Sequence, residues 1–274
     1  MDRRELAIKR HEISKHKNRP TARDYVPHIF DEFIELHGDR GYADDKAILC
    51  GIGKFNGAPV TVVAHVKGRN LRENELANYG MAHPEGYRKA LRFMKQADKF
   101  GRPVVTLVDT PGAFPGPAAE ERGQSEAIAR NLIEMSRLRV PVISVITGMG
   151  GSGGAIGIAQ ANCVLMLENA TYSVISARGF ASILWKDPKR EEEAIVQQRM
   201  TSDDLLELGV IDGVIPEPGE GAHTDAFQTA AAIKSALAPR FNELIKMSPD
   251  ELYEQRYRKF RGVGFFNEID LLGN

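Results

Sequence analysis

The sequence predicts an α/β fold built from repeated strand–strand–helix units, and three observations support this prediction. Short apolar, β-rich runs alternate with longer amphipathic segments, as expected for buried strands covered by helices. Strands come in adjacent pairs at residues 47–66 and 163–175, which departs from a plain alternation of one strand with one helix. Glycine makes up 26 of the 274 residues, and six glycines fall between residues 148 and 157.

Charge and cysteine content exclude several classes of protein. The chain carries 36 Lys and Arg against 37 Asp and Glu, so its formal net charge of −1 creates no overall field for nucleic acid or an anionic membrane. Cys50 and Cys163 are too few for a disulfide framework or a four-cysteine zinc site. The first residues show no apolar signal region, and no run approaches the ~18 apolar residues of a membrane span. We therefore expect a cytoplasmic protein.

The N-terminal end is predicted to be helical. Residues 2–18 are mostly charged, with apolar positions loosely spaced for a helix, which indicates a solvated helix or a partner-docking arm. No aromatic residues interleave with these charges, so contact with nucleic acid is not expected. Apolar residues recur from 24 to 37 with the period of a helix that ends at Gly38.

A hairpin and an alternation of strands with helices follow. The β-rich runs 47–55 and 59–66 are joined at Asn56-Gly57, which is typical of a β-hairpin. Further strands are predicted at residues 103–108, 140–146, 163–167, 172–175 and 210–215. Helices are predicted at residues 85–100, 120–138, 155–161, 178–186, 189–199, 202–208, 224–246 and 248–261.

The glycine run is predicted to be a loop, residues 148–154, that follows a strand and opens a short helix. Glycine lets the main chain approach a ligand closely, and a helix N-terminus offers free N–H groups. These features favour a guest that is anionic or becomes anionic during a reaction. The same run would also suit a tight turn with close helix–sheet packing and no ligand.

Three catalytic templates fit this run. Gly148-x-Gly150-x-x-Gly153 matches the dinucleotide-binding fingerprint, with Glu168 beyond it, although the following helix is thin for a crossover. Ser152 between its flanking glycines matches a nucleophile elbow, but the only downstream histidine, His223, lies in a segment typical of a surface loop.

The third template is an oxyanion hole without a side-chain nucleophile. The backbone N–H groups of Gly153 and Gly154 could hold an enolate or ureido oxygen. Losing one such donor costs about 3 kcal/mol in the reaction barrier.

A second loop, Asp109-Thr-Pro-Gly-Ala-Phe-Pro-Gly116, follows the predicted strand 103–108. Two strand–loop–helix units in tandem place both loops at the carboxyl edge of one sheet, where α/β proteins form their active sites. Asp109 could act as a general base, but an Asp at this position more often caps the turn. Arg122 could pair with a nearby carboxylate such as Glu126 or hold a phosphate.

Several long motifs resemble one family closely. They are Asp109-Thr-Pro-Gly-Ala-Phe-Pro-Gly116, Ala119-Glu-Glu-Arg-Gly-Gln-Ser-Glu-Ala-Ile-Ala-Arg-Asn131, Gly150-Gly-Ser-Gly-Gly-Ala155, Thr171-Tyr-Ser-Val-Ile-Ser176 and Ala181-Ser-Ile-Leu-Trp-Lys186. Through them the chain resembles the alpha subunits of the carboxyltransferase component of bacterial acetyl-CoA carboxylase, from about Asp24 to His223. The resemblance implies a crotonase/ClpP-like fold of repeated ββα units with helical N- and C-terminal segments.

The resemblance also implies a reaction and a site. The carboxyl group of carboxybiotin, carried on the biotin carboxyl carrier protein, passes to acetyl-CoA and gives malonyl-CoA, the first committed step of fatty acid biosynthesis. Gly153 and Gly154 match the glycine pair that holds the biotin carbonyl oxygen. The residues implied to support the loops or bind substrate are Gly112, Ala113, Phe114, Gly150, Gly151 and Ser152.

Partners follow from the same resemblance. The alpha chain is implied to act with a beta subunit, in a heterotetramer of two alpha and two beta chains, alongside the carrier protein and an ATP-dependent biotin carboxylase. The zinc-ribbon cysteines of the family lie on the beta chain, so no metal is expected on this one. A dinucleotide-dependent oxidoreductase and a non-catalytic acyl-CoA-binding subunit are the alternative functions.

Five residues depart from the family pattern near the implied site. Met149 stands in place of a usual glutamate, Phe114 in place of a common tyrosine, and Pro117 in place of an aliphatic residue; Ala177 and Arg178 replace a Pro-Glu pair. The glycine pair is retained, so the chemistry should survive. The predicted organisation is a helical segment 1–40, a carboxyltransferase core 41–223 and a helical segment 224–274, within one carboxyltransferase domain.

Overall fold

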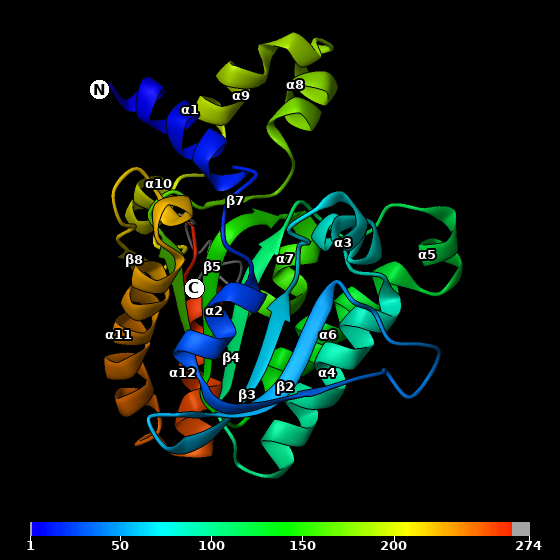
Figure 1. Ribbon diagram of the computed structural model, residues 1–274, viewed down its shortest axis with the longest axis vertical. Helices are drawn as coiled ribbons and strands as arrows, with labels where there is room; N and C mark the ends of the chain where they lie inside the picture. The colour runs from blue at the N-terminus through cyan, green and yellow to red at the C-terminus, as the bar shows by residue number, and fades with distance from the viewer. Residues whose placement is uncertain (1, 265–274) are drawn as a thin grey trace, which may run out of the picture.

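The computed structural model describes residues 2–264, and one mixed β-sheet forms its centre (Figure 1). The strands run in the order β1-β2-β3-β4-β5-β6-β8, and β7 pairs with the end of β5. Their bounds are β1 (Asp31–Leu36), β2 (Ile48–Phe55), β3 (Ala58–His65), β4 (Val104–Thr110), β5 (Val142–Gly151), β6 (Cys163–Leu167), β7 (Thr171–Ser173) and β8 (Gly213–Ile215). The first three strands pair antiparallel, and β3, β4, β5, β6 and β8 pair parallel.

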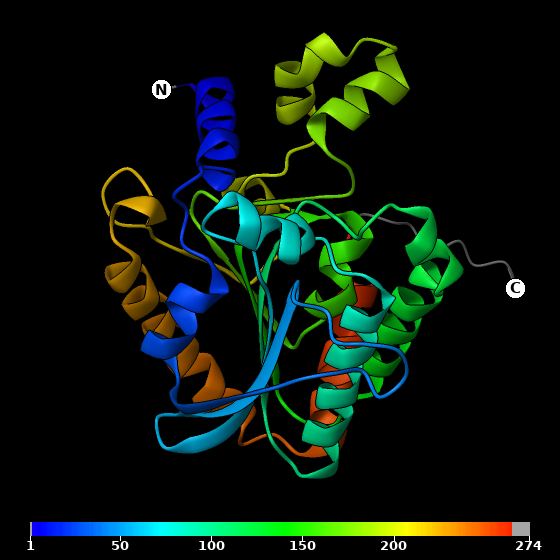
Figure 2. The ribbon, with the colours of Figure 1, turned by 45° about the vertical axis from the view of Figure 1, so that its right-hand side comes forward.

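Helices cover both faces of this sheet. Their bounds are α1 (Arg3–Ser14), α2 (Ala22–Ile29), α3 (Leu71–Leu76), α4 (Pro84–Lys99), α5 (Pro117–Glu121), α6 (Gln124–Arg137), α7 (Ser152–Ala159), α8 (Ala177–Trp185), α9 (Glu191–Gln197), α10 (Ser202–Glu207), α11 (Ala226–Leu244) and α12 (Pro249–Arg261). Figure 2 shows α2 and α11 on one face, and α4 and α6 on the other. Helix α1 and helices α8 and α9 stand beyond the carboxyl edge and share a small apolar core of their own.

The predicted hairpin is confirmed. Strands β2 and β3 pair along their whole length, from Phe55 opposite Ala58 to Ile48 opposite His65. At the turn Asn56 has φ 50° and Gly57 has φ 82°. A two-residue hairpin turn of this kind requires positive φ at both central positions, which Asn-Gly tolerates best.

The helix predicted for residues 24–37 is wrong in its second half. Helix α2 ends at Ile29, and the chain continues as β1, which pairs antiparallel with β2. Phe33 and Leu36 pack against the core, whereas Ile34, which fits the helical stripe, is 65% exposed. A six-residue run does not distinguish the two periods, and pairing with a distant strand decides the outcome.

The single helix predicted for residues 120–138 is two helices. Helix α5 ends at Glu121, and α6 begins at Gln124 after Gly123, which has φ 82°. A left-handed residue cannot continue an α-helix, and glycine adopts this conformation at little cost. Strand 210–215 is also shorter than expected, because only Gly213–Ile215 pairs with β6.

The loop predicted for residues 148–154 is wrong as well. Strand β5 continues to Gly151, and α7 begins at the next residue, Ser152. Pairing of Met149, Gly150 and Gly151 with β7 extends the strand to this point. The reversal therefore falls on Ser152 alone, which has φ 49°. Among residues 2–264, no helix is long and apolar enough to cross a membrane.

Candidate functional site

Two strand-to-helix turns meet in direct main-chain contact at the carboxyl edge of the sheet, as the tandem units predicted. An ideal Cβ at Gly151 would lie 2.2 Å from the carbonyl oxygen of Pro111. One at Gly154 would lie 2.4 Å from the carbonyl carbon of Gly112 and 2.5 Å from the nitrogen of Ala113. No side chain fits at such distances, so glycine at 151 and 154 is required by the approach of the two turns.

Gly153 differs from these two glycines. A Cβ added at Gly153 would meet only the Ile128 side chain, at 3.8 Å. Gly153 is half-buried and Gly154 is buried. Steric contact therefore explains glycine at 154 and leaves glycine at 153 without a packing reason.

The N–H groups of Gly153 and Gly154 lie in the first turn of α7. Within the described part of the chain, neither N–H donates a hydrogen bond to another residue. The first N–H groups of a helix have no partner inside it, and together they carry a partial positive charge. The pair can therefore receive an oxygen atom that bears or develops negative charge.

Helix α7 is held in place by side chains from the two helices beside it. Tyr87 of α4 donates a hydrogen bond from Oη to the carbonyl oxygen of Gly154, at 3.3 Å. Asn131 of α6 donates from Nδ2 to the carbonyl oxygens of Tyr87, at 3.1 Å, and Gly157, at 2.9 Å. Both side chains are fully buried. Tyr87 and Asn131 were not predicted as site residues, although both lie in the motifs that carry the family resemblance.

The turn that contains Phe114 is fixed separately. The Phe114 N–H donates to the carbonyl oxygen of Ala82 at 3.1 Å. The Gln124 side chain donates from Nε2 to the carbonyl oxygens of Ala82, at 2.8 Å, and Phe114, at 3.0 Å. The His83 ring stacks on the Phe114 ring with centroids 4.2 Å apart. Phe114 is therefore a positioned side wall, as expected for a residue that supports the loop.

Asp109 connects the two turns. Its buried carboxylate accepts a hydrogen bond from the Met149 N–H at 2.8 Å and forms an ion pair with Lys67. It therefore anchors the neighbouring strand instead of capping its own turn. Arg122 pairs with Glu85 at 2.9 Å, and the expected partner Glu126 pairs with Arg130.

A cavity of about 180 Å³ adjoins the glycine turn. Pro111, Gly150 and Gly151 form one wall, and two of the residues that depart from the family pattern, Met149 and Ala177, also line it. His11 of α1 faces the cavity, and burial lowers the pKa of His11 to about 4, so its ring is neutral at pH 7. Pro117 is the first residue of α5, where proline is well tolerated.

The remaining templates find little support in the described residues. The strained φ of Ser152 resembles a nucleophile elbow, but no histidine hydrogen-bonds to Ser152 in residues 2–264. His223 stacks on His16 instead, with ring centroids 4.0 Å apart. Glu168, the residue that would bind a ribose, accepts from Arg10 and from the Glu217 N–H. Residues 2–264 contain no cluster of three or more His, Cys, Asp or Glu that could hold a metal.

Comparison with solved structures defines the fold class. Transcarboxylase 12S, in a structure with methylmalonyl-coenzyme A and methylmalonic acid bound, aligns with a TM-score of 0.69 and 20% identity over 98% of this chain and 47% of that chain. The chain thus spans about half the length of that protein. A Pseudomonas malonate decarboxylase hetero-dimer aligns with a TM-score of 0.64 and 20% identity over 80% of this chain and 89% of that one. The protein has the crotonase-like fold of the acyl-CoA carboxyltransferases, as the resemblance implied.

Sequence comparison gives the particular family. Residues 5–264 match the family model described as acetyl co-enzyme A carboxylase carboxyltransferase-like. The alpha subunits of acetyl-coenzyme A carboxylase carboxyl transferase from Staphylococcus carnosus and Staphylococcus haemolyticus are 56% and 55% identical over 94% of this chain and 82% of their own length. The chain belongs to this family of alpha subunits. It is a carboxyltransferase subunit that acts in a complex with a beta subunit, and neither alternative function is supported.

Proposed function

We propose that this chain helps transfer the carboxyl group of carboxybiotin to acetyl-CoA by holding the biotin carbonyl oxygen with the N–H groups of Gly153 and Gly154. The observation that carries this proposal is the pair of unpartnered N–H groups at the start of α7. Two adjacent donors suit a ureido oxygen that gains negative charge. When bound, carboxybiotin supplies the carboxyl group, and the biotin left behind can take the acetyl proton.

The contribution of this chain is electrostatic. Donors fixed in position before the reaction favour charge that develops on the oxygen, and one such donor is worth about 3 kcal/mol of barrier. Tyr87 and Asn131 keep α7 from shifting, and Gly151 and Gly154 let the Pro111–Ala113 turn support it from the other side. Such a site needs no side-chain nucleophile from this chain.

The proposal includes the partners that the family implies. The beta subunit supplies a second hole, for the thioester enolate, and carries the zinc. The assembly is a heterotetramer of two alpha and two beta chains, and biotin arrives on its carrier protein after carboxylation by biotin carboxylase. The Gly153 and Gly154 pair opens at the carboxyl edge, where a partner can complete the site.

The first test is malonyl-CoA decarboxylation with free biotin as acceptor, which is the reverse half-reaction. We expect no turnover from this chain alone and turnover once the beta subunit is added. Turnover by the isolated chain at the rate of the complex would contradict a shared site.

The second test separates catalysis from scaffolding. Gly153→Val should lower kcat of the complex about 100-fold, because a branched side chain crowds an oxygen held by its own N–H group. The fold should persist, since a Cβ at residue 153 contacts only Ile128, at 3.8 Å. Ala129→Val, on the exposed face of α6, is the matched control. Wild-type activity in the Gly153→Val complex would favour a non-catalytic acyl-CoA-binding subunit.

A further inference from the structure

A positively charged groove runs along the segment that links α1 to α2. Two adjoining cavities of about 240 and 220 Å³ form it and share Lys17, Arg19, Thr21 and Gly68 in their walls. We call these two cavities together the basic groove. Lys67, Arg69 and Tyr79 line its other wall. The basic groove lies at the same carboxyl edge of the sheet as the glycine turn, because Asp109 and Met149 close its inner end.

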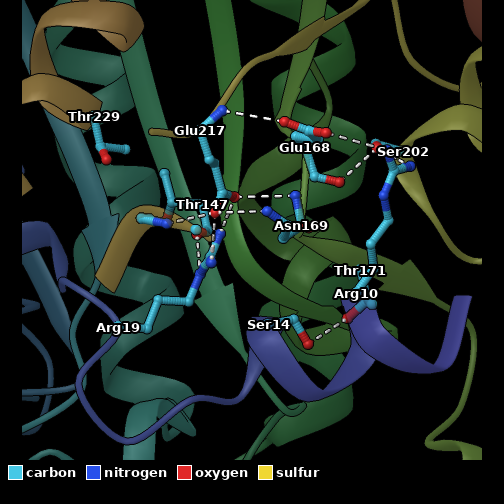
Figure 3. A network of polar contacts seen from close by, with 12 residues as sticks. Arg10, Ser14, Arg19, Thr147, Glu168, Asn169, Thr171, Ser202, Glu217 and Thr229 are labelled. Atoms are coloured by element: carbon cyan, nitrogen blue, oxygen red, sulfur yellow. Dashed lines mark hydrogen bonds and ion pairs between the residues drawn. The ribbon is translucent and has the colours of Figure 1, made fainter. Parts of the chain in front are cut away.

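The wall formed by the N-terminal segment is firmly fixed. Arg19 donates from Nε to the carbonyl oxygen of Thr147 at 2.9 Å and pairs with Glu217 at 2.6 Å, as Figure 3 shows. The Arg19 and Glu217 side chains are 3% and 0% exposed. Arg10 holds the preceding helix through Ser202 and Asp203. The basic groove therefore exists before any ligand binds, and no ordering of this segment opposes binding.

The charge of the basic groove is not balanced within the protein. Its cationic lining residues are Lys15, Lys17, Arg19, Lys67 and Arg69, and its carboxylates are Asp24 and Asp109. Glu217 neutralises Arg19 from behind, which leaves a formal excess of two positive charges in a chain whose net charge is −1.

Lys17 is the clearest source of free charge. It is exposed, and no ion pair involves it in the described residues. The Lys15 Nζ lies 3.9 Å from the nearest carboxylate oxygen, on Glu191, which is at the limit of an ion pair. A concave, positively charged surface of this kind concentrates anions, and phosphate groups bind to it with charge-assisted hydrogen bonds.

Tyr79 adds an aromatic ring to the basic groove. The preceding Asn78 has φ 48° and Tyr79 has φ 55°, a conformation that costs side-chain-bearing residues about 1 kcal/mol or more each. Such strain persists only where the surroundings hold it, and here it presents a ring that is 46% exposed to the groove. An aromatic face beside cations suits a ligand that combines phosphates with a base or another planar group.

The basic groove is continuous with the cavity at the glycine turn. Lys15 and Met149 line both, and the cavity then reaches Pro111, Gly150 and Gly151. An extended ligand can therefore keep its anionic end in the groove and direct its other end towards the turn.

We propose that the basic groove binds the phosphate groups of coenzyme A, so that this chain shares in holding the acyl-CoA substrate. This inference rests on the proposed function for the identity of the substrate. The phosphates contact Lys15, Lys17 and Lys67, and the pantetheine arm leads past Met149 towards the glycine turn. Free pyrophosphate offers the same charge, and the experiment below distinguishes it from coenzyme A.

The binding test uses the full chain together with the beta subunit. Calorimetric titration compares coenzyme A, 3′-dephospho-coenzyme A, pantetheine and pyrophosphate with the wild type and with Lys17→Glu. Lys9→Glu is the matched control, because Lys9 is exposed on α1 and does not line the groove. We expect Lys17→Glu to raise the Kd of coenzyme A about tenfold or more and to leave the Kd of pantetheine unchanged.

Four outcomes overturn the proposal. They are an equal Kd for coenzyme A in both variants, an equal effect of Lys17→Glu on pantetheine, pyrophosphate bound as tightly as coenzyme A, and an RNA oligonucleotide that binds more tightly than coenzyme A and is lost in Lys17→Glu. The last outcome would make the basic groove a nucleic-acid site. Lys17→Arg keeps the charge and should restore the Kd, which separates a charge effect from misfolding.

A kinetic arm distinguishes failure of this inference from failure of the proposed function. In the decarboxylation assay, Lys17→Glu should lower kcat/KM for malonyl-CoA about tenfold and leave it unchanged for malonyl-pantetheine. Normal kcat/KM for both substrates would reject the groove and leave the oxyanion assignment intact. No turnover by the wild-type complex would reject the proposed function, while the calorimetric titration still tests the groove.

Discussion

His65 is a buried ionisable side chain at the end of β3. It is 1% exposed, and neither ring nitrogen has a hydrogen-bond partner in the described residues. Burial lowers the pKa of His65 to about 3, although Asp109 nearby acts in the opposite direction. The ring is therefore neutral in the folded protein under conditions where an unfolded chain would protonate it.

This difference predicts a loss of stability in mild acid. Below the unfolded pKa of about 6.5 and above the folded pKa, only the unfolded state binds the proton, so the free energy of unfolding falls as the pH falls. His65 alone should remove about 2 kcal/mol between pH 7 and pH 5. Urea unfolding of His65→Leu should lose that much less than the wild type over this range, and His28→Leu, on the exposed surface of α2, serves as the control. An identical pH dependence in His65→Leu and the wild type would contradict this account.

The glycine turn gives a second prediction at the scale of the residue. Gly154→Ala should lower the free energy of unfolding by about 1–3 kcal/mol, because its Cβ would lie 2.4 Å from the Gly112 main chain. Gly153→Ala should change stability by less than about 0.5 kcal/mol, since its Cβ has 3.8 Å of space. Urea denaturation of both variants measures the contrast, and equal losses would show that the two turns are not in rigid contact.

At the scale of the element, the position of α7 depends on neighbouring helices. Asn131→Leu removes both donors to the carbonyl oxygens of Tyr87 and Gly157. Unmet buried carbonyls cost about 1–3 kcal/mol each, less where a carbonyl also accepts within its own helix. We expect a loss of about 2 kcal/mol in urea unfolding together with reduced kcat. Ala129→Leu on the exposed face of α6 should change neither, and unchanged stability of Asn131→Leu would contradict the role given to this amide.

The elements that could be predicted from sequence are those with local signals. The β2–β3 hairpin depends on Asn56-Gly57, whose conformational preference needs no distant partner. Strand β1 could not be predicted, because pairing with β2 and not its own periodicity makes it a strand. The break between α5 and α6 was missed although Gly123 marks it, since helical periodicity on both sides conceals a single left-handed residue.

At the scale of the whole molecule, Arg19 ties the N-terminal segment to the carboxyl edge. Removing one partner of a buried ion pair leaves the other charge unmatched, at a cost of about 3–5 kcal/mol. Glu217 keeps its hydrogen bonds from Asn169 and Ala222, so Arg19→Met should cost about 3 kcal/mol. Urea unfolding measures this loss, with Arg23→Met, which removes an exposed pair, as the control. A loss below about 1 kcal/mol would show that the segment is not anchored there.

The candidate site was only partly accessible to sequence reasoning. The glycine pair and the Asp109–Gly116 turn stand out by composition and by family motif, and their contact follows from the rule for parallel strands. Tyr87, Gln124 and Asn131 could not be assigned, because their roles arise only when α4 and α6 pack beside α7. The basic groove was also missed, because its cations come from two distant segments and share one wall only after folding.

The central claim is that the main chain of this protein donates the catalytic hydrogen bond. Replacing Gly153 by glycolic acid turns its amide into an ester, which removes the N–H group and adds no side chain. The same replacement at Gly57, in the hairpin turn, is the matched control. With the beta subunit present, kcat for malonyl-CoA decarboxylation should fall about 100-fold for the ester at residue 153, with an unchanged Tm, and stay at the wild-type value for the ester at 57. A wild-type kcat for the ester at 153 would contradict the claim.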